Sequence, residues 1–388
     1  MRIGIFSESY EPIINGVSVS VCTLRDELTR RGHDVFVFAP AFNGHQDTSD
    51  NVFRFPSAHT PLMRDYPFPI PFSPKLRQTF ASLKLDVVHT QTPFLLGILG
   101  AKWARDCGVS LVSTNHTLYT EYSHYVPIRP KTLTRGFLIR LMKWYYSGCD
   151  AVVVPSHPVE ETLRSYDIQT RVEVIKTGIV GIPPCDADTQ RDVRKRHGIN
   201  DDEFLLLYVG RIAREKNLSM LLDAFKQVST RHNNIRLMMV GGGPALEETK
   251  RYASELGLAD KVVFTGMLKR LQIEPIYSSA DAFAFPSTTE TQGIAVCEAL
   301  SAGLPVIAVN AGGIPENIKH EVDGFLTGNN PTDFAGRIEF LISNESQRLK
   351  MGECARVNAR QFSIERMVDD FEQFYSSILH KKRATSTL

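Results

Sequence analysis

Short apolar runs alternate with longer stretches of helical periodicity from the first residues of the chain onward. The short runs are rich in β-branched and aromatic residues, which predicts strands. The predicted strands are 2–6, 35–39, 87–89, 111–114, 151–155 and 172–175, then 204–209, 236–240, 261–264, 282–285 and 306–308. Helical stretches lie between them, the first at about 17–31. This alternation predicts α/β folding around parallel sheets that helices cover on both faces.

A break in the pattern divides these strands into two series. It spans 177–200 and includes Gly178, Gly181, Pro183, Pro184 and Gly198, a composition typical of a linker. We therefore predict two Rossmann-like domains, 1–180 and 181–364, that face each other across a cleft. The remaining residues, 365–388, are predicted to form a C-terminal helix to about 379 that packs back on the first domain, followed by a frayed polar tail.

Composition excludes several classes of protein. The chain is 43% apolar and 22% charged, which is ordinary for a soluble globular protein. Its 6 cysteines form no C-x-x-C pair, so we expect reduced thiols and no metal bound through sulfur. Glu8 comes too early for a signal-peptide apolar region, and no apolar run approaches the ~20 residues that span a bilayer. A cytoplasmic protein is expected.

The net charge of +1 conceals an uneven distribution. Between Arg54 and Lys143, basic residues outnumber acidic residues by twelve to four, and 128–148 contains basic residues without an acidic one. This predicts a basic surface in the first domain, for which nucleic acid, anionic lipid and phosphate-bearing substrates are candidate partners.

The most informative segment is 290–298, Glu-Thr-Gln-Gly-Ile-Ala-Val-Cys-Glu, directly after a predicted strand. If a helix begins near Thr291 or Gly293, the Glu290 carboxylate lies at the helix mouth and Glu298 lies more than one turn inside. First-turn N–H groups of Gly293 and Ile294 then point outward, which suits phosphate oxygens. The spacing favours a site for a nucleotide diphosphate sugar. The alternative is that Glu290 caps the helix and Glu298 is a solvated surface residue.

A second strand end carries two cations. Arg211 and Lys216 follow the predicted strand 204–209, and a guanidinium fork with an ammonium group suits a departing diphosphate. A solvated basic loop is the alternative. The glycine turn 241–243 is interpreted as a structural βα connection.

Loops of the first domain offer further candidates. Asn15-Gly16 lets the backbone after the first strand approach a ligand closely, although the loop does not match G-x-G-x-x-G. His116 follows the strand 111–114, where a lone histidine is more often a satisfied polar residue than a catalyst. His89 lies at a comparable strand end, and we expect it to buttress the loop. The chain shows no H-E-x-x-H, P-loop or nucleophile elbow, which argues against hydrolase and kinase functions.

Taken in chain order, these motifs resemble the retaining GT-B glycosyltransferases of the family-four type. The matching features are the Gly16 loop, His116, Gly210-Arg211 with Lys216, Thr265-Gly266 and Glu290-x7-Glu298. The likeness covers nearly the whole chain. Glu290-Thr-Gln-Gly and His116-Thr-x-Tyr-x-x-Tyr-x-His-Tyr further resemble the diacylglycerol glucosyltransferase branch, which makes membrane glycolipids. The resemblance implies transfer of a hexose, glucose from UDP-glucose, to a lipid acceptor such as diacylglycerol, without a nucleic-acid partner.

The resemblance also implies a role for each matched residue. Arg211 and Lys216 bind the donor diphosphate, Glu298 holds the ribose hydroxyls, and His116 and Glu290 contact the transferred sugar. Backbone groups complete the donor site, with N–H groups from Gly16, Gly293 and Ile294 and the base-contacting segment Gly266, Met267 and Leu268. Tyr119 and Tyr122 are assigned to the acceptor side.

One departure from the family concerns the hinge. Members commonly carry an acidic residue after the hinge Gly-Ile or Gly-Val, where this chain reads Gly178-Ile-Val180-Gly181, so we assign the hinge no catalytic role. Retention without an evident protein nucleophile implies front-face substitution, in which the protein stabilises developing charge. No cofactor or metal is expected, because Arg211 and Lys216 take the role of a divalent cation.

The basic surface includes a helix predicted to lie on an anionic membrane. Apolar residues recur at near-helical spacing with cations between them: Leu133, Phe137, Leu141, Trp144 and Tyr145, with Lys131, Arg135, Arg140 and Lys143. The aromatic loop 66–72 is predicted as a second contact. This pattern favours peripheral attachment to the inner face of the membrane. Packing of the apolar residues into the domain core is the alternative.

Other functions fit part of the same evidence. A glycosyltransferase with a soluble or phosphatidylinositol acceptor needs the same donor site. A sugar-nucleotide epimerase needs no acceptor cleft, and incubation with a nucleotide sugar alone distinguishes it. A two-lobed solute-binding protein is disfavoured because no export signal was found in the sequence.

Overall fold

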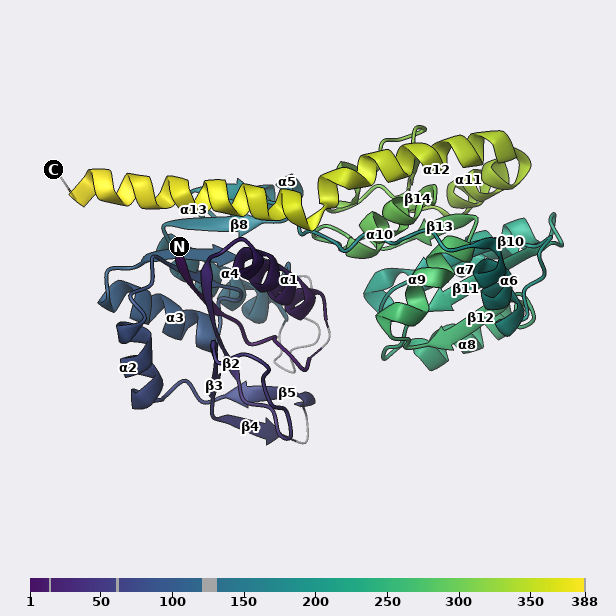
Figure 1. Cartoon of the computed structure of the whole chain (residues 1–388). Helices are drawn as coiled ribbons and strands as arrows, with labels where there is room; N and C mark the ends of the chain where they lie inside the picture. Colours follow the sequence, from purple (N-terminus) through teal and green to yellow (C-terminus); the bar gives the residue numbers. More distant parts are fainter. Residues whose placement is uncertain (14, 61–62, 121–130, 387–388) are drawn as a thin grey trace. The chain divides into compact units, whose positions relative to one another are not determined.

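The computed structural model describes residues 1–13, 15–60, 63–120 and 131–386 (Figure 1). The chain forms two compact units. Unit 1 consists of Met1–Gly178 together with Ile364–Leu388, and unit 2 consists of Ile179–Ser363. The boundaries drawn from the sequence fall at 180 and 364.

Unit 1 is built from alternating strands and helices. In chain order its elements are β1 (Arg2–Phe6), α1 (Gly16–Arg30), β2 (Asp34–Pro40), β3 (Val52–Phe55), β4 (Ser57–Thr60), β5 (Met63–Pro69), α2 (Pro74–Ser82), β6 (Val87–Thr90), α3 (Leu95–Asp106), β7 (Ser110–Thr114), α4 (Lys131–Ser147), β8 (Ala151–Val154), α5 (His157–Ser165), β9 (Val172–Val174) and α13 (Ile364–Ser386). Among the described residues, seven strands form a sheet in the order β3-β2-β1-β6-β7-β8-β9. All its neighbouring strands are parallel.

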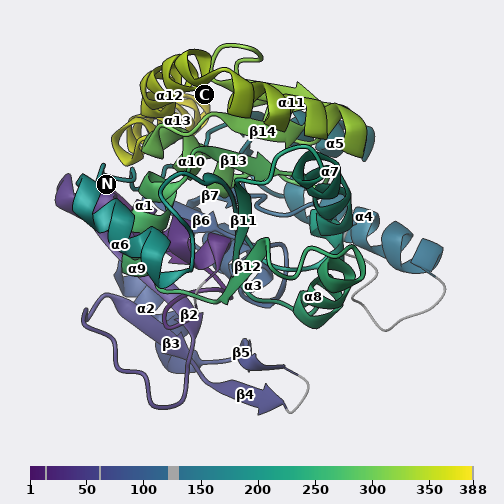
Figure 2. The same cartoon turned by 90° about the vertical axis from the view of Figure 1, so that its right-hand side faces the viewer.

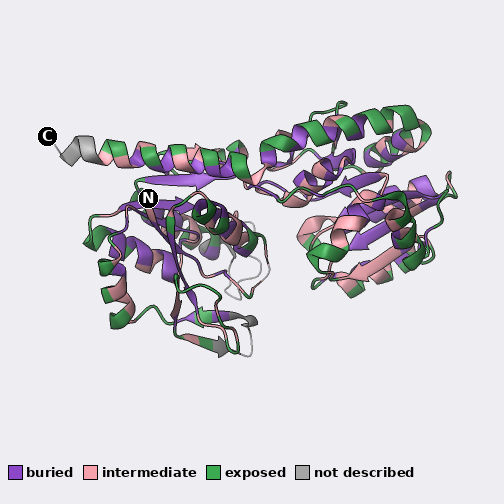
Figure 3. Ribbon diagram, viewed as in Figure 1, coloured by how far each residue is buried: buried purple, intermediate pink, exposed green. Residues whose placement is uncertain are grey.

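The two faces of this sheet bury different side chains, as strand alternation requires. On one face Ile3, Ile5 and Val37 pack in a cluster with residues of α1 and α13. On the other face Phe6 and Phe38 pack with residues of α2, α3, α4 and α5. Figure 3 shows the buried strands and the exposed outer faces of the helices. Unit 1 is therefore a three-layer α/β/α structure.

Helix α13 is held on unit 1 by polar as well as apolar contacts. Arg31, just after α1, donates to Asp369 at 2.6 Å and to Glu372 at 2.7 Å. The Tyr375 hydroxyl lies 2.8 Å from Nδ1 of His89, deep in the core. The helix continues through Ser386, so the prediction that 381–388 forms a frayed tail is wrong for the described part of that segment.

Unit 2 repeats the alternation. Its elements are α6 (Ala187–Arg196), β10 (Phe204–Val209), the 3-10 turn η2 (Arg214–Lys216), α7 (Leu218–Ser229), β11 (Ile235–Val240), α8 (Leu246–Glu255), β12 (Val262–Gly266), α9 (Arg270–Ser279), β13 (Ala282–Phe285), α10 (Ile294–Ala302), β14 (Val306–Val309), η3 (Ile314–Glu316), β15 (Gly324–Thr327), α11 (Pro331–Ser343), α12 (Glu345–Ala359) and η4 (Arg360–Phe362). In the described part of the chain, six strands pair in parallel in the order β12-β11-β10-β13-β14-β15. Figure 2 shows α11 and α12 beside β14.

The predicted strands are confirmed as elements of two parallel sheets, most of them within one or two residues at each end. Three of them, β1, β10 and β13, match the predicted ranges in full. Strands β3, β4, β5 and β15 were not predicted. The predicted aromatic loop 66–72 is partly wrong, because β5 runs through Pro69 and pairs with β4. In the residues that the structure describes, every helix is too short or too polar to cross a bilayer.

The contacts of Glu27 in α1 predict a pH-dependent stability. Hydrogen bonds from Arg30 and Arg31 lower the pKa of Glu27 to about 2, from an ordinary value of 4.5. A depressed folded-state pKa stabilises the fold above pH 4.5, and this contribution disappears as the pH falls toward 2. Glu27→Gln should lower the free energy of unfolding by about 2 kcal/mol at pH 7, the usual value for bonds to a charged group. The difference from wild type should vanish near pH 2.

Urea unfolding of both proteins between pH 2 and pH 7 measures this difference. The neighbouring Asp26 offers a matched control, because its ion pair with Arg25 leaves the carboxylate 64% exposed. Asp26→Asn should change stability little at any pH. A Glu27→Gln defect of equal size at pH 7 and pH 2 contradicts the electrostatic explanation.

Candidate functional site

The predicted site residues of unit 2 lie at one edge of its sheet. Strands β12, β11, β10 and β13 are neighbours in that order, and parallel strands present their carboxyl ends at the same edge. Backbone hydrogen bonds join the loops that follow three of them. The Gly210 N–H donates to the Val240 carbonyl at 3.0 Å, and the Gly241 N–H donates to the Gly266 carbonyl at 3.0 Å. The loops after β10, β11 and β12 therefore form one connected surface.

The backbone of Arg211 is fixed by a hydrogen bond, whereas its side chain is exposed. The buried Tyr208 donates its hydroxyl to the Arg211 carbonyl at 3.0 Å. The next residue, Ile212, donates its N–H to the Gly242 carbonyl at 2.9 Å. The glycine turn 241–243 thus supports the Arg211 loop, in keeping with its structural interpretation. The side chain of Arg211 is exposed.

Lys216 forms an ion pair with Glu290. Its Nζ lies 2.5 Å from Glu290 Oε1, and both side chains are 15% exposed. Lys216 ends η2, and the following Asn217 donates its side-chain amide to the Pro286 carbonyl at 3.1 Å. The structure therefore joins a cation after β10 and a carboxylate after β13. The alternative of a solvated basic loop does not describe Lys216.

Glu290 is positioned by the loop after β14. The Gly313 N–H donates to the Glu290 carbonyl at 2.9 Å. A Cβ on Gly312 would lie 2.3 Å from that same carbonyl oxygen, and Gly312 has a φ of +55°, so the close approach requires glycine. Glu290 does not cap α10, because Gly293 occupies the N-cap position.

Helix α10 begins at Ile294, as the spacing predicted. Gly293 has a φ of +85°, and a Cβ there would lie 2.3 Å from Cδ1 of Ile314. Glycine therefore allows the chain to enter the helix against the η3 turn. The first N–H groups of a helix lack an i−4 acceptor within the helix, and the helix dipole favours negative charge at this end.

Glu298 lies inside α10 and is not a solvated surface residue. Its side chain is 15% exposed. Oε1 accepts from Arg270 at 2.7 Å, and Oε2 accepts from the buried Tyr277 hydroxyl at 3.1 Å. Sequence reasoning did not single out Arg270, whose only local signal is its place at the first residue of α9, just after a strand end.

The segment proposed to meet a base follows β12. Gly266 has a φ of +71°, and its carbonyl accepts from Gly241. Met267 is 81% exposed, whereas Leu268 packs against the core of unit 2. An exposed thioether offers an apolar surface for a flat ring.

His116 lies in unit 1 after β7. Its Nε2 is 2.7 Å from the side-chain oxygen of Gln91, which follows β6. Burial lowers the pKa of His116 to about 4, so the imidazole is neutral at pH 7. His89 is fully buried between Thr114 and Tyr375, and burial lowers its pKa to about 3. Its position agrees with a buttressing role.

Glu8, after β1, is a polar residue of this region whose setting the sequence did not reveal. Its Oε1 accepts from the Leu96 N–H at 2.7 Å, and Thr92 donates its hydroxyl to Oε2. Burial raises the pKa of Glu8 to about 7, while the Leu96 hydrogen bond opposes the rise. Burial next to Glu8 also raises the pKa of Tyr119. The signal in the sequence was an acidic residue directly after a strand.

The other candidates of unit 1 are Gly16 at the start of α1 and two tyrosines, Tyr119 and Tyr122. Gly16 begins α1 and is exposed, and Asn15 caps the helix by accepting from the Ser18 N–H at 2.9 Å. Tyr119 packs against Phe94 with ring centroids 4.9 Å apart. Tyr122 lies outside the described residues.

Helix α4 exposes apolar residues together with cations. Phe137 is 65% exposed and Trp144 is 57% exposed, which excludes the alternative that both face the core. Arg135 and Arg140 are exposed, whereas Lys143 forms an ion pair with Asp167 at 2.5 Å.

The prediction that Tyr145 of α4 faces the membrane is wrong. Tyr145 is 3% exposed and donates its hydroxyl to Thr90 at 2.6 Å. Consecutive helical residues differ by about 100° in direction, so Trp144 and Tyr145 face opposite surroundings.

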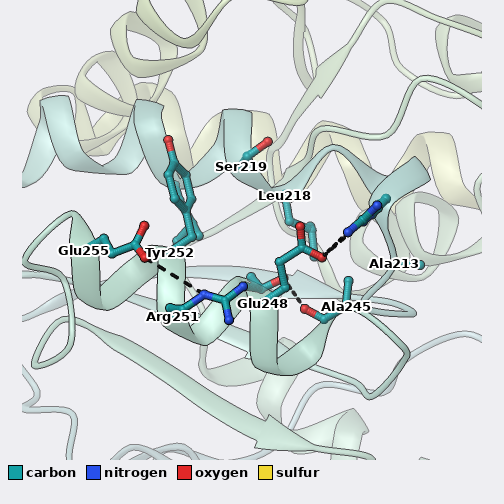
Figure 4. A pocket seen from close by; sticks show the side chains of 11 residues that line it. Ala213, Leu218, Ser219, Ala245, Glu248, Arg251, Tyr252 and Glu255 are labelled. Atoms are coloured by element: carbon teal, nitrogen blue, oxygen red, sulfur yellow. Dashed lines mark hydrogen bonds and ion pairs between the residues drawn. The ribbon is translucent and has the colours of Figure 1, made fainter.

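A cavity of about 400 Å³ lies in unit 2 between α7 and α8. Figure 4 shows its charged lining, in which Glu248 reaches Arg214 at 3.1 Å and Arg251 reaches Glu255 at 4.0 Å. It contains none of the predicted site residues. Its charges are already paired with one another, so we do not assign it to the site.

Comparisons with known proteins cover both units. The family model "Glycosyltransferase Family 4" matches residues 14–180, and "Glycosyl transferases group 1" matches residues 189–358. The alpha-monoglucosyldiacylglycerol synthase of Streptococcus pneumoniae is 36% identical over 79% of this chain and 71% of its own length. The enzyme of the same name from Acholeplasma laidlawii is 32% identical over 79% of this chain and 80% of its own length.

A solved structure extends the likeness to the fold of the whole chain. Sucrose-phosphate synthase from Thermosynechococcus elongatus superposes with a TM-score of 0.80, covering 98% of this chain and 100% of that chain at 22% identity.

Proposed function

The chain belongs to the GT-B glycosyltransferases of group 1 and family 4, and we propose that it transfers glucose from UDP-glucose to a lipid acceptor such as diacylglycerol, with retention at the anomeric carbon. The observation that carries this proposal is the grouping of Arg211, the Lys216–Glu290 pair and the α10 N-terminus at one sheet edge. Two relatives named for glucosyldiacylglycerol synthesis support the acceptor.

Each charged group has a part in the proposed donor site. Arg211 and Lys216 bind the diphosphate, and the N–H groups of Gly293 and Ile294 complement its oxygens. Glu298 accepts the ribose hydroxyls. The Arg211 side chain is exposed, and Lys216 approaches the diphosphate from its pair with Glu290.

The sugar is contacted by the other candidates. Glu290 and the neutral His116 accept and donate hydrogen bonds to its hydroxyls, while Met267 and its neighbours meet the base. Gly16 offers a backbone N–H at the start of α1. These assignments place the two cations against the diphosphate, and a carboxylate and a neutral imidazole against the sugar.

In the proposed reaction the bond from the anomeric carbon to the phosphate oxygen breaks, and a bond from the acceptor oxygen forms on the same face. The acceptor hydroxyl proton passes to the departing phosphate oxygen, so no protein nucleophile is needed. The protein lowers the barrier by stabilising charge that develops on the diphosphate. Arg211 and Lys216 supply the positive charge, and the proposal includes no metal or cofactor.

Helix α4 is the proposed membrane contact on the acceptor side. Phe137, Arg140 and Trp144 share one exposed face, because residues three and four apart are neighbours on a helix. Apolar side chains that insert below the head groups, with cations among anionic lipids, give peripheral binding. The proposed location is the cytoplasmic face of the membrane.

The product identifies both substrates. Purified protein should be incubated with UDP-glucose, UDP-galactose or GDP-mannose and with diacylglycerol, phosphatidylinositol or a soluble sugar, and the product analysed by mass spectrometry and anomeric NMR. An α-glucosyl diacylglycerol is expected from UDP-glucose. An inositol-linked or soluble product, a β-linkage, or an isomerised nucleotide sugar in the absence of acceptor overturns the corresponding part of the proposal.

The two cations should matter for turnover more than for folding. Arg211→Ala or Lys216→Ala should lower kcat by roughly 10²–10³-fold, the usual loss when one donor to transition-state charge is removed. Arg214→Ala is the matched control, since Arg214 lies on the same loop, is 83% exposed and pairs with Glu248. Steady-state kinetics with thermal melts measures both properties. Turnover near wild type in the first two variants removes those residues from the site.

Membrane binding should depend on α4. The protein should sediment with phosphatidylglycerol vesicles and be released in high salt. The double change Arg135→Ser with Arg140→Ser should weaken binding roughly tenfold or more, since each cation near anionic lipid contributes on the order of 1 kcal/mol. Arg191→Ser with Arg196→Ser on α6 removes the same charge elsewhere and is the control. Equal binding by both double variants excludes α4 as the anchor.

A further inference from the structure

Arg270 is the first residue of α9 and is fixed on three sides. Its Nη1 donates to Glu298 Oε1 at 2.7 Å, and its Nη2 donates to the Val180 carbonyl at 2.7 Å. Its Nε donates to Glu274 Oε1 at 3.0 Å, one turn further along the same helix. The side chain is 42% exposed, yet each of its three nitrogens donates to one of these acceptors. The guanidinium is therefore an ordered group at the surface.

Glu298 receives one donor on each oxygen. Arg270 binds Oε1, and the hydroxyl of Tyr277 binds Oε2 at 3.1 Å. Tyr277 is fully buried, and burial beside Glu298 raises its pKa, so its hydroxyl stays protonated and remains a donor. Arg270, Glu274 and Tyr277 lie at i, i+4 and i+7 of α9, which places them on one helical face. Two donors on two oxygens fix the plane of the carboxylate.

We propose that Arg270 is a positioning residue that orients the Glu298 carboxylate and thereby gives the donor site its preference for an intact ribose. This inference rests on the proposed function, in which Glu298 accepts the ribose hydroxyls. Each carboxylate oxygen keeps a second lone pair after binding its protein donor, and Glu298 remains 15% exposed. The free lone pairs then have fixed directions, which is what recognition of two adjacent hydroxyls requires.

An oriented Glu298 carboxylate should increase selectivity for the ribose hydroxyls more than the overall affinity for the nucleotide. Hydrogen bonds to a charged group discriminate strongly only when their geometry is good. Without Arg270, the carboxylate keeps its charge but loses the partner that fixes Oε1. Binding of the diphosphate should persist, because Arg211 and Lys216 are untouched, while the contribution of the ribose hydroxyls should fall.

Calorimetric titration of the full chain with UDP, 2′-deoxy-UDP and 3′-deoxy-UDP tests this idea without an acceptor. Wild type should prefer UDP over at least one deoxy analogue by roughly 10- to 100-fold, the range for hydrogen bonds to a charged group. Arg270→Ala should lose most of that preference, and Arg270→Lys should keep part of it. Tyr277→Phe should cause a comparable loss through the other oxygen.

Arg231→Ala is the control, because Arg231 is a 61% exposed arginine whose ion pair with Glu339 lies outside this network. It should retain the wild-type preference. If Arg270→Ala lowers the affinity for UDP and for both deoxy analogues by the same factor, Arg270 has a merely structural role and the inference is overturned. An unchanged preference in Arg270→Ala, or a wild type without any preference, overturns it as well while leaving diphosphate binding intact. Failure of the wild type to bind either UDP or GDP overturns the proposed function itself.

Discussion

The ion pair between Lys216 and Glu290 is the contact on which the site of unit 2 depends. It joins residues 74 positions apart in the chain and brings the loop after β10 to the loop after β13. Both side chains are largely withdrawn from water, so each charge needs the other. The backbone around it is equally constrained, since Gly312 allows the chain to pass directly against the Glu290 carbonyl. The same contacts therefore fix both the position of Glu290 at this sheet edge and the cation that neutralises it.

Features that are local in the chain could be predicted from the sequence, whereas contacts between distant residues, such as Lys216 with Glu290, could not. Strands such as β1, β10 and β13 are continuous apolar runs, and a run buried on both faces is visible in local composition. Strand β15 begins at Gly324 and ends at Thr327, so its apolar run is only Phe325-Leu326 and the same signal is weak there. Candidate site residues could be singled out because polar side chains after strands are conspicuous in a sequence. Their partners could not, because pairing depends on distances in three dimensions.

Helix α13 illustrates the limit further. Its apolar periodicity predicted a helix, but the extension to Ser386 lies in a polar stretch that reads as a tail. The contacts that attach it, from Arg31 to Asp369 and from His89 to Tyr375, span 338 and 286 residues. In α4 the spacing of apolar and basic residues was visible in the sequence, but the sequence did not show which apolar residues face the core. Trp144 and Tyr145 are both aromatic and adjacent, yet the first is exposed and the second is in the core.

The two units differ in the electrostatic character of their candidate residues. In unit 2 the candidate side chains are acidic and basic groups near the positive end of α10, and two cations accompany the carboxylates. In unit 1 burial keeps His116 neutral, and the pKa of Glu8 near 7 leaves that carboxyl partly protonated under ordinary conditions. A neutral set of donors and acceptors can bind hydroxyl groups without drawing a charged diphosphate toward itself. The charged set suits an anion such as a diphosphate, and the difference between the two sets reflects the cost of burying charge.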